Sequence, residues 1–473
     1  MSEILRSREE IPQEYKWNLE DIFSSFDEWE KMFKETEKMV GQVERYAGKM
    51  SESAEQLLEC LEWAEELGSN IEELFSYARM RRDEDNRVPT YQGMTDRANM
   101  LAVQVGSALS FIVPELLAIP EKRLEELRQD KKLKIYDHNL DDIIRRRVHV
   151  LSPAEEKLLA EAGELAEAPS TIFSMANDAD MKFDSIKDEN NKDVELTKGN
   201  YIKFMESSDR RVRKDAFKTL YLAYGKQINT WAATLNASIK SDCFFARSRK
   251  YNSALEEALD DDKVPSTVYD SLINSVHDFL PQMHRYMALR KKLLGLDELH
   301  MYDIYTPLVP EMDAHIAYNE AKEMVSKGLS PLGDRYLKIL DTGYNMGWID
   351  IYENAGKTSG AYSWGTYKSH PFVLLNHQDT LDSLFTLAHE MGHALHSYFS
   401  NEKQSHIYAG YKIFVAEVAS TLNETLVMKH LIDNTDDTKM QAYLINHYLE
   451  QFRGTVFRQT MFAEFEKITH AAV

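Results

Sequence analysis

The sequence predicts a mainly α-helical protein, and three observations support this expectation. The chain has only 19 glycines and 12 prolines among 473 residues, so residues that break helices are scarce. Long stretches place apolar residues at the helical period, and we expect helices within the ranges 200–256, 265–295, 315–340 and 436–470. A chain of this length exceeds one ordinary core, which predicts two or more lobes.

Two segments near the start show the helical signals in detail. One stripe of apolar residues runs along 53–67 and comprises Leu57, Leu58, Leu61, Ala64 and Leu67. Further on, Ser152 can cap a helix, Pro153 suits its first position, and Glu155 completes a capping box. We therefore expect one helix after Ser53 and another after Ser152.

A polar stretch over residues 184–198 interrupts the helical pattern. It has few apolar residues and predicts either a hairpin or a connection between lobes. We place a domain boundary there, with a helical N-terminal lobe over 1–185 and a second domain over 186–473 that carries the motifs described below.

The composition restricts the classes of function. A formal net charge of −22 disfavours nucleic acid as a partner, because such binding depends on Lys and Arg at phosphates. The acidity is consistent with solubility alone or with an acidic cleft for basic ligands.

Without a signal-like start or roughly 20 consecutive apolar residues, we expect neither export nor a membrane span. The only two cysteines, Cys60 and Cys243, favour a reducing compartment, so we expect the cytoplasm.

Glycines gather between residues 343 and 365, just before an apolar run over 371–376. The run is bounded by turn residues and predicts a strand. Because glycine lets backbone approach backbone, this region could bind an extended peptide as an added strand. A plain β-hairpin explains the same pattern, and both interpretations stay open.

The segment 379–398 contains the motif His-Glu-x-x-His. Asp379 or Thr380 can cap its helix, and residues four apart lie on one helical face, so His389 and His393 can reach one zinc ion. Glu390 is offset by about 100° and should flank the metal, where it could act as a general base on a zinc-bound water. Gly392 costs roughly 1 kcal/mol relative to Ala inside a helix, which predicts a close-packing contact.

A third metal ligand can be proposed downstream. Glu417 has apolar flanks, which predict burial, and a buried carboxylate needs a cation. Zinc would complete a His₂Glu set, although an Arg or Lys partner is the alternative. Glu424 lies seven residues on, and it could accept a hydrogen bond from a ligand histidine or lie on the surface.

Two other metal-binding arrangements are disfavoured by the residue spacing. His396 lies two turns from His389, roughly 10.5 Å along the helix, so we expect polar packing or substrate contact rather than metal ligation. A di-iron centre needs a second Glu-x-x-His motif on another helix, and the sequence has none in a suitable place.

Together these segments resemble oligoendopeptidase F, in the M3 family of zinc oligopeptidases. The resemblance covers essentially the whole chain and rests on linked motifs at 16–23, 300–308, 360–367, 371–376, 387–398, 414–420 and 452–462.

The resemblance implies a two-lobed helical fold that encloses a deep channel, with a small β-sheet beside the His-Glu-x-x-His helix. It implies hydrolysis of internal bonds in short, unstructured peptides, with one Zn²⁺ per chain held by His389, His393 and Glu417, and with Glu390 as the catalytic glutamate. The loop and strand before that helix would line the peptide-binding side. The candidate substrate-binding residues are Gly360, Ala361, Tyr362, Gly365, Tyr367 and His396.

The sequence departs from the family in one respect. Family members continue past this point with a helical segment whose histidine and tyrosines contact substrate and stabilise the oxyanion, and the 473 residues lack that segment. Loss of one oxyanion donor costs about 100- to 1000-fold in rate, so we expect weak activity or none from this form. One alternative is therefore a catalytically impaired peptide-binding fragment. A second alternative is a helical metallocarboxypeptidase with the same His-Glu-x-x-His motif. The oligomeric state is not predicted.

Overall fold

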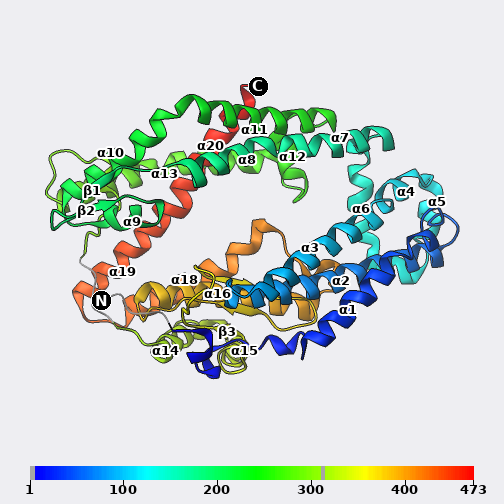
Figure 1. The fold of residues 1–473 in the computed structure, drawn as a ribbon, viewed down its shortest axis with the longest axis horizontal. Helices are drawn as coiled ribbons and strands as arrows, with labels where there is room; N and C mark the ends of the chain where they lie inside the picture. The colour runs from blue at the N-terminus through cyan, green and yellow to red at the C-terminus, as the bar shows by residue number, and fades with distance from the viewer. Residues whose placement is uncertain (1–5, 310–314) are drawn as a thin grey trace. The chain divides into compact units, whose positions relative to one another are not determined.

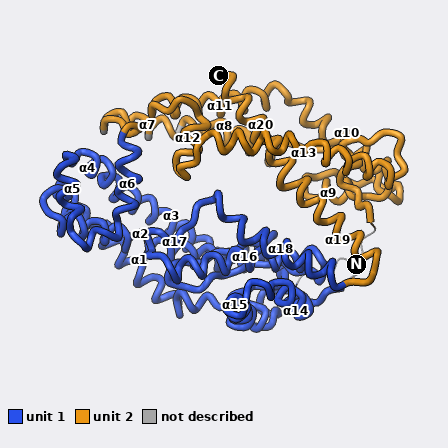
Figure 2. Tube along the Cα trace, turned by 180° about the vertical axis from the view of Figure 1, so that it is seen from behind, with its two compact units in different colours: residues 1–147, 313–434 blue, residues 148–312, 435–473 orange. Residues whose placement is uncertain are grey.

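The computed structural model describes residues 6–309 and 315–473, and these are mostly helical (Figure 1), as predicted. The chain forms two compact units, shown in different colours in Figure 2. Unit 1 comprises residues 1–147 and 313–434, and unit 2 comprises residues 148–312 and 435–473. The boundary that we expected at 185/186 lies inside unit 2, at a hairpin. Unit 1 is assembled from two stretches that are distant in the sequence.

Unit 1 contains eleven of the labelled helices and one sheet. Its helices are α1 (Phe26–Val40), α2 (Ala54–Glu84), α3 (Pro89–Leu109), α4 (Ile112–Ala118), α5 (Glu121–Leu127), α6 (Asp137–Arg145), α14 (Tyr318–Gly328), α15 (Asp334–Asn345), α16 (Leu381–Lys403), α17 (His406–Ala409) and α18 (Ile413–Asp433). Its strands are β3 (Ile349–Asp350), β4 (Tyr362–Trp364) and β5 (Phe372–Leu374).

The long helix α2 organises the N-terminal part of unit 1. The Ser53 hydroxyl caps it by accepting from the Gln56 N–H at 3.1 Å. The predicted stripe is buried at Leu57, Leu58, Leu61 and Leu67. Helix α3 packs along α2. By length and composition alone, the stretch Pro89–Ala118 could cross a membrane, but its buried members lie in the cores against α2.

The sheet of unit 1 has the order β3-β5-β4. The central strand β5 pairs parallel with β3 and antiparallel with β4, with Ser363 opposite Val373. All three β5 residues are buried, which confirms the strand predicted within 371–376. Helix α16 packs against β4 and β5. Strand β4 therefore forms an edge of the sheet beside the helix that carries the His-Glu-x-x-His motif.

Unit 2 is a helical assembly with a two-stranded hairpin. It contains α7 (Pro153–Ala166), α8 (Ala168–Ser174), α9 (Lys198–Glu206), α10 (Arg210–Lys226), α11 (Ile228–Ser248), α12 (Ala254–Asp260), α13 (Ser266–Leu293), α19 (Thr438–Gln451), α20 (Arg458–Ala471), β1 (Ser185–Lys187) and β2 (Asp193–Glu195). The capping box of Ser152 and Glu155 is present at α7, as predicted. Of the two interpretations of residues 184–198, the hairpin is correct.

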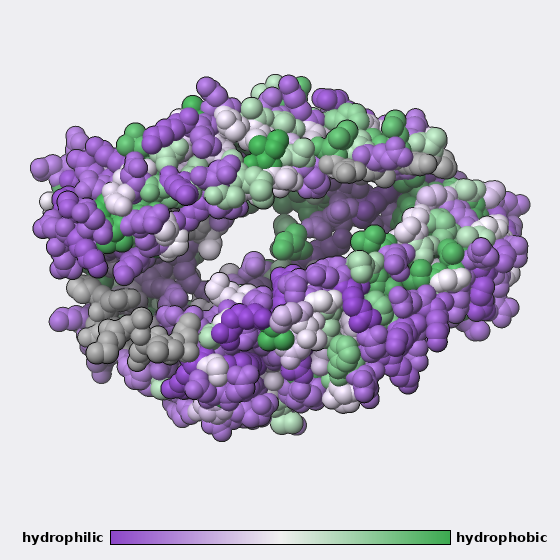
Figure 3. Space-filling view, in the orientation of Figure 1, coloured by the Kyte–Doolittle hydropathy of each residue, from purple (hydrophilic) through white to green (hydrophobic). Residues whose placement is uncertain are grey.

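Hydrophilic residues cover most of the visible surface in Figure 3, with apolar residues scattered between them. This distribution is ordinary for globular proteins, whose surfaces always include some apolar side chains.

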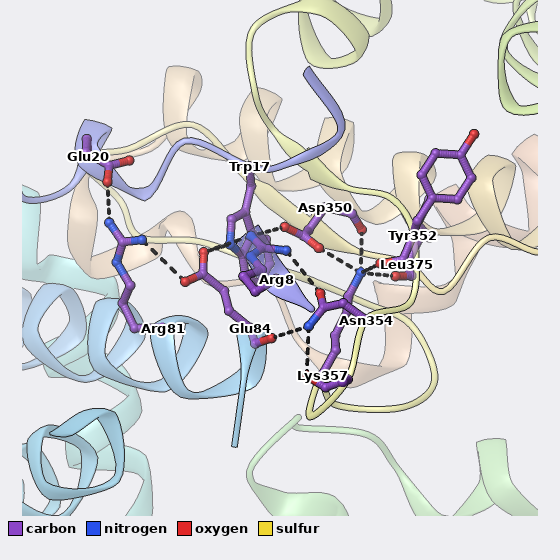
Figure 4. Close-up of polar contacts among 11 residues, drawn as sticks. Arg8, Trp17, Glu20, Arg81, Glu84, Asp350, Tyr352, Asn354, Lys357 and Leu375 are labelled. Carbon is purple, nitrogen blue, oxygen red and sulfur yellow. Dashed lines mark hydrogen bonds and ion pairs between the residues drawn. The ribbon is translucent and has the colours of Figure 1, made fainter. Parts of the chain in front are cut away.

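A buried ion pair holds the loop that leads into β4. The Lys357 ammonium is fully buried and lies 2.7 Å from Oδ1 of Asp350, which ends β3 (Figure 4). The ammonium also donates to the Tyr352 carbonyl at 2.7 Å and to the Leu375 carbonyl at 2.5 Å. Lys357 thereby ties this loop to β3, which precedes it, and to Leu375, which follows β5.

Arg8 connects this pair to the N-terminal part of unit 1. Its guanidinium donates to the other oxygen of Asp350, and it pairs with Glu84 at 3.0 Å (Figure 4). Glu84, at the end of α2, also accepts from the Trp17 indole at 2.7 Å. A single buried network therefore joins the chain start, α2 and the sheet.

We predict that Lys357→Met lowers the free energy of unfolding by about 3–5 kcal/mol, because it leaves a buried carboxylate without one of its two cations. Urea unfolding followed by circular dichroism measures this loss. Lys338→Met on the exposed side of α15 is the control and should stay within about 0.5 kcal/mol of the parent. Equal stability of the two variants would contradict the role assigned to Lys357.

Candidate metal centre

Helix α16 forms as its sequence predicts. Thr380 is the N-cap, and its hydroxyl accepts from the Ser383 N–H at 3.2 Å. All the apolar residues predicted to face the core are buried, namely Leu381, Leu384, Phe385, Ala388, Met391 and Leu395. The helix is therefore held on its apolar side, and this orientation fixes where its histidines point.

Helices α16 and α18 cross at very close range. A Cβ atom added to Gly392 would lie 2.6 Å from the Ser420 Cα and 2.9 Å from the Ala419 carbonyl oxygen. The buried Asn423 amide donates to the Ala388 carbonyl at 3.0 Å and accepts from the Tyr336 hydroxyl at 2.9 Å. Gly392 thus has the close-packing role that its position in a helix predicted.

This crossing brings three potential metal ligands together. His389 Nε2 lies 3.2 Å from His393 Nε2, and these atoms lie 3.4 Å and 3.3 Å from Glu417 Oε2. Among the residues that the structure describes, these three form the group able to share one metal ion. Ligands about 2.0–2.1 Å from a tetrahedral zinc ion are separated by about 3.3 Å, so the triangle fits zinc.

Each of the three ligand groups has an outer partner. The Glu424 carboxylate contacts His389 Nδ1, which directs Nε2 toward the triangle. The imidazole of His393 hydrogen-bonds to the backbone of Ala416. The buried Ser420 hydroxyl donates to Glu417 Oε2 at 2.7 Å. The Glu424 contact involves Nδ1 of His389 and not the Nε2 atom of the triangle, whereas Ser420 donates to the same Glu417 oxygen, Oε2, that faces the histidines.

Glu390 is buried beside the triangle and is not part of it. Burial raises the pKa of its carboxyl to about 7, and the neighbouring Glu417 carboxylate also raises that pKa. His389 and a backbone hydrogen bond from Ser363 act in the opposite direction. Because Ser363 is the middle residue of β4, this hydrogen bond places Glu390 next to the edge strand.

One expectation about Glu417 is wrong. Its apolar flanks predicted burial, but the Glu417 side chain is 60% exposed, and Ile413, Phe414 and Val418 are exposed as well. The apolar character of this turn of α18 therefore does not reflect a core contact inside unit 1. Glu417 reaches the histidines because it lies one turn before Ser420, where the two helices touch.

The structure also places the candidate substrate-binding residues. Gly360 has φ +84°, a conformation that favours glycine, and its carbonyl accepts from the Asn376 amide at 2.8 Å. Ala361 follows it into β4. The Tyr362 hydroxyl donates to Asp83 at 2.9 Å, so this side chain points toward α2. The Tyr367 hydroxyl donates to the Gln404 carbonyl at 2.9 Å, and Gly365 lies between these tyrosines.

His396 does not join the ligand group. Its ring stacks on Tyr411 with 3.7 Å between ring centroids. The contact that the structure gives His396 is this aromatic stack, and both polar packing and substrate contact stay predictions.

Sequence reasoning missed Ser420, Asn423 and Ser363. Ser420 and Asn423 act through contacts between helices α16 and α18, and Ser363 acts through its backbone. Their side-chain types carry no signal for these roles, although the position of Ser420 three residues after Glu417 could have suggested a local hydrogen bond.

Two family profiles match this chain. The profile of peptidase family M3 matches residues 203–473, and that of oligopeptidase F matches residues 115–183. Oligopeptidase PepF of Bacillus subtilis is 46% identical over 98% of this chain and 70% of its own length. An oligoendopeptidase F homolog of Lactococcus lactis is 42% identical over 99% of this chain and 78% of its own length.

Solved structures show the same relationship. Oligoendopeptidase-F from Enterococcus faecium is 37% identical, with a TM-score of 0.70 over 94% of this chain and 75% of that chain. A structure described as that of a peptidase from Chlamydophila abortus is 31% identical, with a TM-score of 0.89 over 99% of this chain and 79% of that chain.

The chain therefore belongs to peptidase family M3, a family of metallopeptidases. Within that family its relatives are oligoendopeptidases F, and the chain is a metalloendopeptidase of the oligopeptidase F group.

We predict that Gly392→Ala destabilises the protein by about 1–3 kcal/mol, because its methyl group must push α16 and α18 apart. The same displacement should weaken metal binding, since it separates Glu417 from the histidines. Urea unfolding and titration of the metal-free protein with zinc measure the two effects.

The matched control is Gly68→Ala in the middle of α2, where an added Cβ meets nothing within 4 Å. This change should stabilise the protein by up to about 1 kcal/mol through helix propensity. If both variants behave alike, the helix contact is not the constraint described here.

Proposed function

We propose that this chain is a zinc-dependent endopeptidase that hydrolyses internal bonds of short, unstructured peptides. The observation that carries the proposal is the triangle of His389, His393 and Glu417, whose sides of 3.2–3.4 Å suit one tetrahedral ion. Three protein ligands leave a fourth position open, as catalytic zinc sites require. The endopeptidase relatives support the same conclusion.

Zinc, when bound, supplies a Lewis acid that polarises the scissile carbonyl and acidifies water. Glu390 acts as the general base, because its carboxyl is buried beside the ligand triangle and is not one of the three ligand groups. It accepts the proton of the attacking water and then delivers that proton to the leaving amine. Glu424 and Ser420 hold His389 and Glu417 in place throughout.

The edge strand β4 is the proposed peptide-binding element. An extended peptide can add to such an edge through main-chain hydrogen bonds, and Ser363 places this edge beside Glu390. Gly360, Ala361, Tyr362 and Gly365 contribute backbone, since the Tyr362 side chain already binds Asp83. Tyr367 lies beyond the C-terminal end of β4, where its hydroxyl donates to the Gln404 carbonyl. His396 contributes indirectly, because its ring stacks on that of Tyr411.

The remaining expectations belong to the same proposal. We infer a cytoplasmic location because Cys60 and Cys243 are unpaired and buried in different units, which suits a reducing compartment. The net charge of −22 makes nucleic acid an unfavourable partner.

A metallocarboxypeptidase would use the same metal ligands. The two activities are separated by incubating the protein with one nonapeptide and identifying the products by mass spectrometry. Internal cleavage supports the proposal, and stepwise loss of C-terminal residues would support the carboxypeptidase.

Glu390→Gln should keep one zinc per chain and lower the hydrolysis of a quenched fluorescent peptide by about 100- to 10,000-fold, because the variant lacks the base. Zinc content by mass spectrometry and initial rates test this together. Hydrolysis at the parent rate would refute the role of Glu390.

Glu424→Ala should weaken zinc binding by about 10- to 100-fold, because the Nδ1 side of His389 loses its partner. Competition with a chromogenic chelator measures the affinity. Thr425→Ala, on the exposed side of α18, is the control and should bind zinc as the parent does. Unchanged affinity in Glu424→Ala would show that this contact does not support the site.

A further inference from the structure

A pocket of about 430 Å³ lies in unit 1 at the end of β4. Its walls come from the residues after β4, from one side of α16, from α17 with the residues after it, and from α2. They include Trp364, Tyr367, Ser397, His406, Tyr411 and Glu72.

The pocket adjoins the proposed catalytic centre along two elements. Ser397 lies four residues after His393 and therefore one turn further along the same face of α16. In β4, the backbone of Ser363 lies near Glu390, and Tyr367 follows four residues later, in the turn after the strand. A peptide extended along this edge advances about 3.3 Å per residue. A residue two to four positions from the cleaved bond would therefore reach the pocket.

The walls are held together by hydrogen bonds. The Asn401 amide donates to the Thr366 carbonyl at 3.2 Å, and the Tyr367 hydroxyl donates to the Gln404 carbonyl at 2.9 Å. Ser397 and Tyr411 share a hydrogen bond of 3.0 Å. The pocket is thus pre-formed, which reduces the ordering that a ligand must supply.

The charge of the pocket is negative. Glu72 accepts from the Tyr367 N–H at 3.3 Å and lies 3.6 Å from His406 Nε2, while Glu65 lies 3.4 Å from His406 Nδ1. Two carboxylates therefore share one imidazole, and a negative charge remains even when that imidazole is protonated. The lining residues that the structure describes include no lysine or arginine. Two cations lie near the pocket, and each already has a carboxylate partner. The Arg79 guanidinium lies over the Trp364 ring and pairs with Asp83, and Lys368 pairs with Glu73 at 3.0 Å.

We propose that this pocket is a substrate subsite for a cationic group located two to four residues on the N-terminal side of the cleaved bond. The group is either the ammonium of the peptide N-terminus or a Lys or Arg side chain. An acidic pocket selects the N-terminal side because a peptide ends there in an ammonium and at its other end in a carboxylate. The peptide accordingly runs antiparallel to β4. This inference rests on the proposed peptidase function and specifies its substrates.

The test measures peptide binding without hydrolysis, in the Glu390→Gln protein. Nonapeptides labelled with a fluorophore at the C-terminal end carry Lys or Gln near the N-terminus, each with a free or an acetylated amine. Fluorescence anisotropy gives Kd for each peptide. We expect the peptides with a cationic group to bind about tenfold more tightly than the acetylated Gln peptide, as one charge-assisted contact allows.

Adding Glu72→Gln should abolish that preference. Adding Glu66→Gln, which changes an exposed carboxylate of α2 outside the pocket, should leave it intact. The free and acetylated peptides show whether the ammonium or the side chain is recognised. A peptide with its only Lys near the C-terminus tests the direction and should bind like the Gln peptide.

The inference is wrong if the preference is absent, or if it survives in Glu72→Gln. Failure of the peptidase proposal would appear separately, as equal hydrolysis rates of the parent chain and Glu390→Gln, and it would leave these binding constants readable.

Discussion

The close approach of helices α16 and α18 is the constraint on which the candidate centre depends. Gly392 has no side chain, so the backbone of Ser420 can lie against it. His389 and His393 flank Gly392 on one helix, and Glu417 lies one turn before Ser420 on the other. The contact that packs the two helices therefore also sets the distances between the three ligand groups. A wider crossing would separate Glu417 from the histidines without altering either helix.

Much of α16 could be predicted from sequence because helix geometry is local. The cap at Thr380, the buried apolar face and the shared face of His389 and His393 all follow from residue spacing. The position of Glu417 could not be predicted in this way. Its carboxylate lies 3.3–3.4 Å from the two histidines, but the burial argument behind its prediction is wrong, since its side chain is 60% exposed. Only the packing between helices explains its place.

Long-range contacts also explain why the organisation of the chain was harder to predict. The polar stretch over residues 184–198 is a local hairpin, whereas the units are divided at positions without such a signal. Arg8, Glu84, Asp350 and Lys357 come from three distant parts of the sequence and form one buried network in unit 1 (Figure 4). Glu72 and Tyr367 are 295 residues apart and meet at the pocket wall. Composition and periodicity contain no information about such pairs.

We propose that two imidazoles and one carboxylate hold a single ion across the α16–α18 contact. This can be measured by X-ray absorption at the zinc edge, on the zinc-loaded protein and on its Glu417→Ala variant. We expect two imidazole nitrogens and at least one oxygen at about 2.0–2.2 Å from zinc in the parent, and a changed first shell in the variant. A first shell without imidazole, or an identical spectrum after loss of the Glu417 carboxylate, would contradict it.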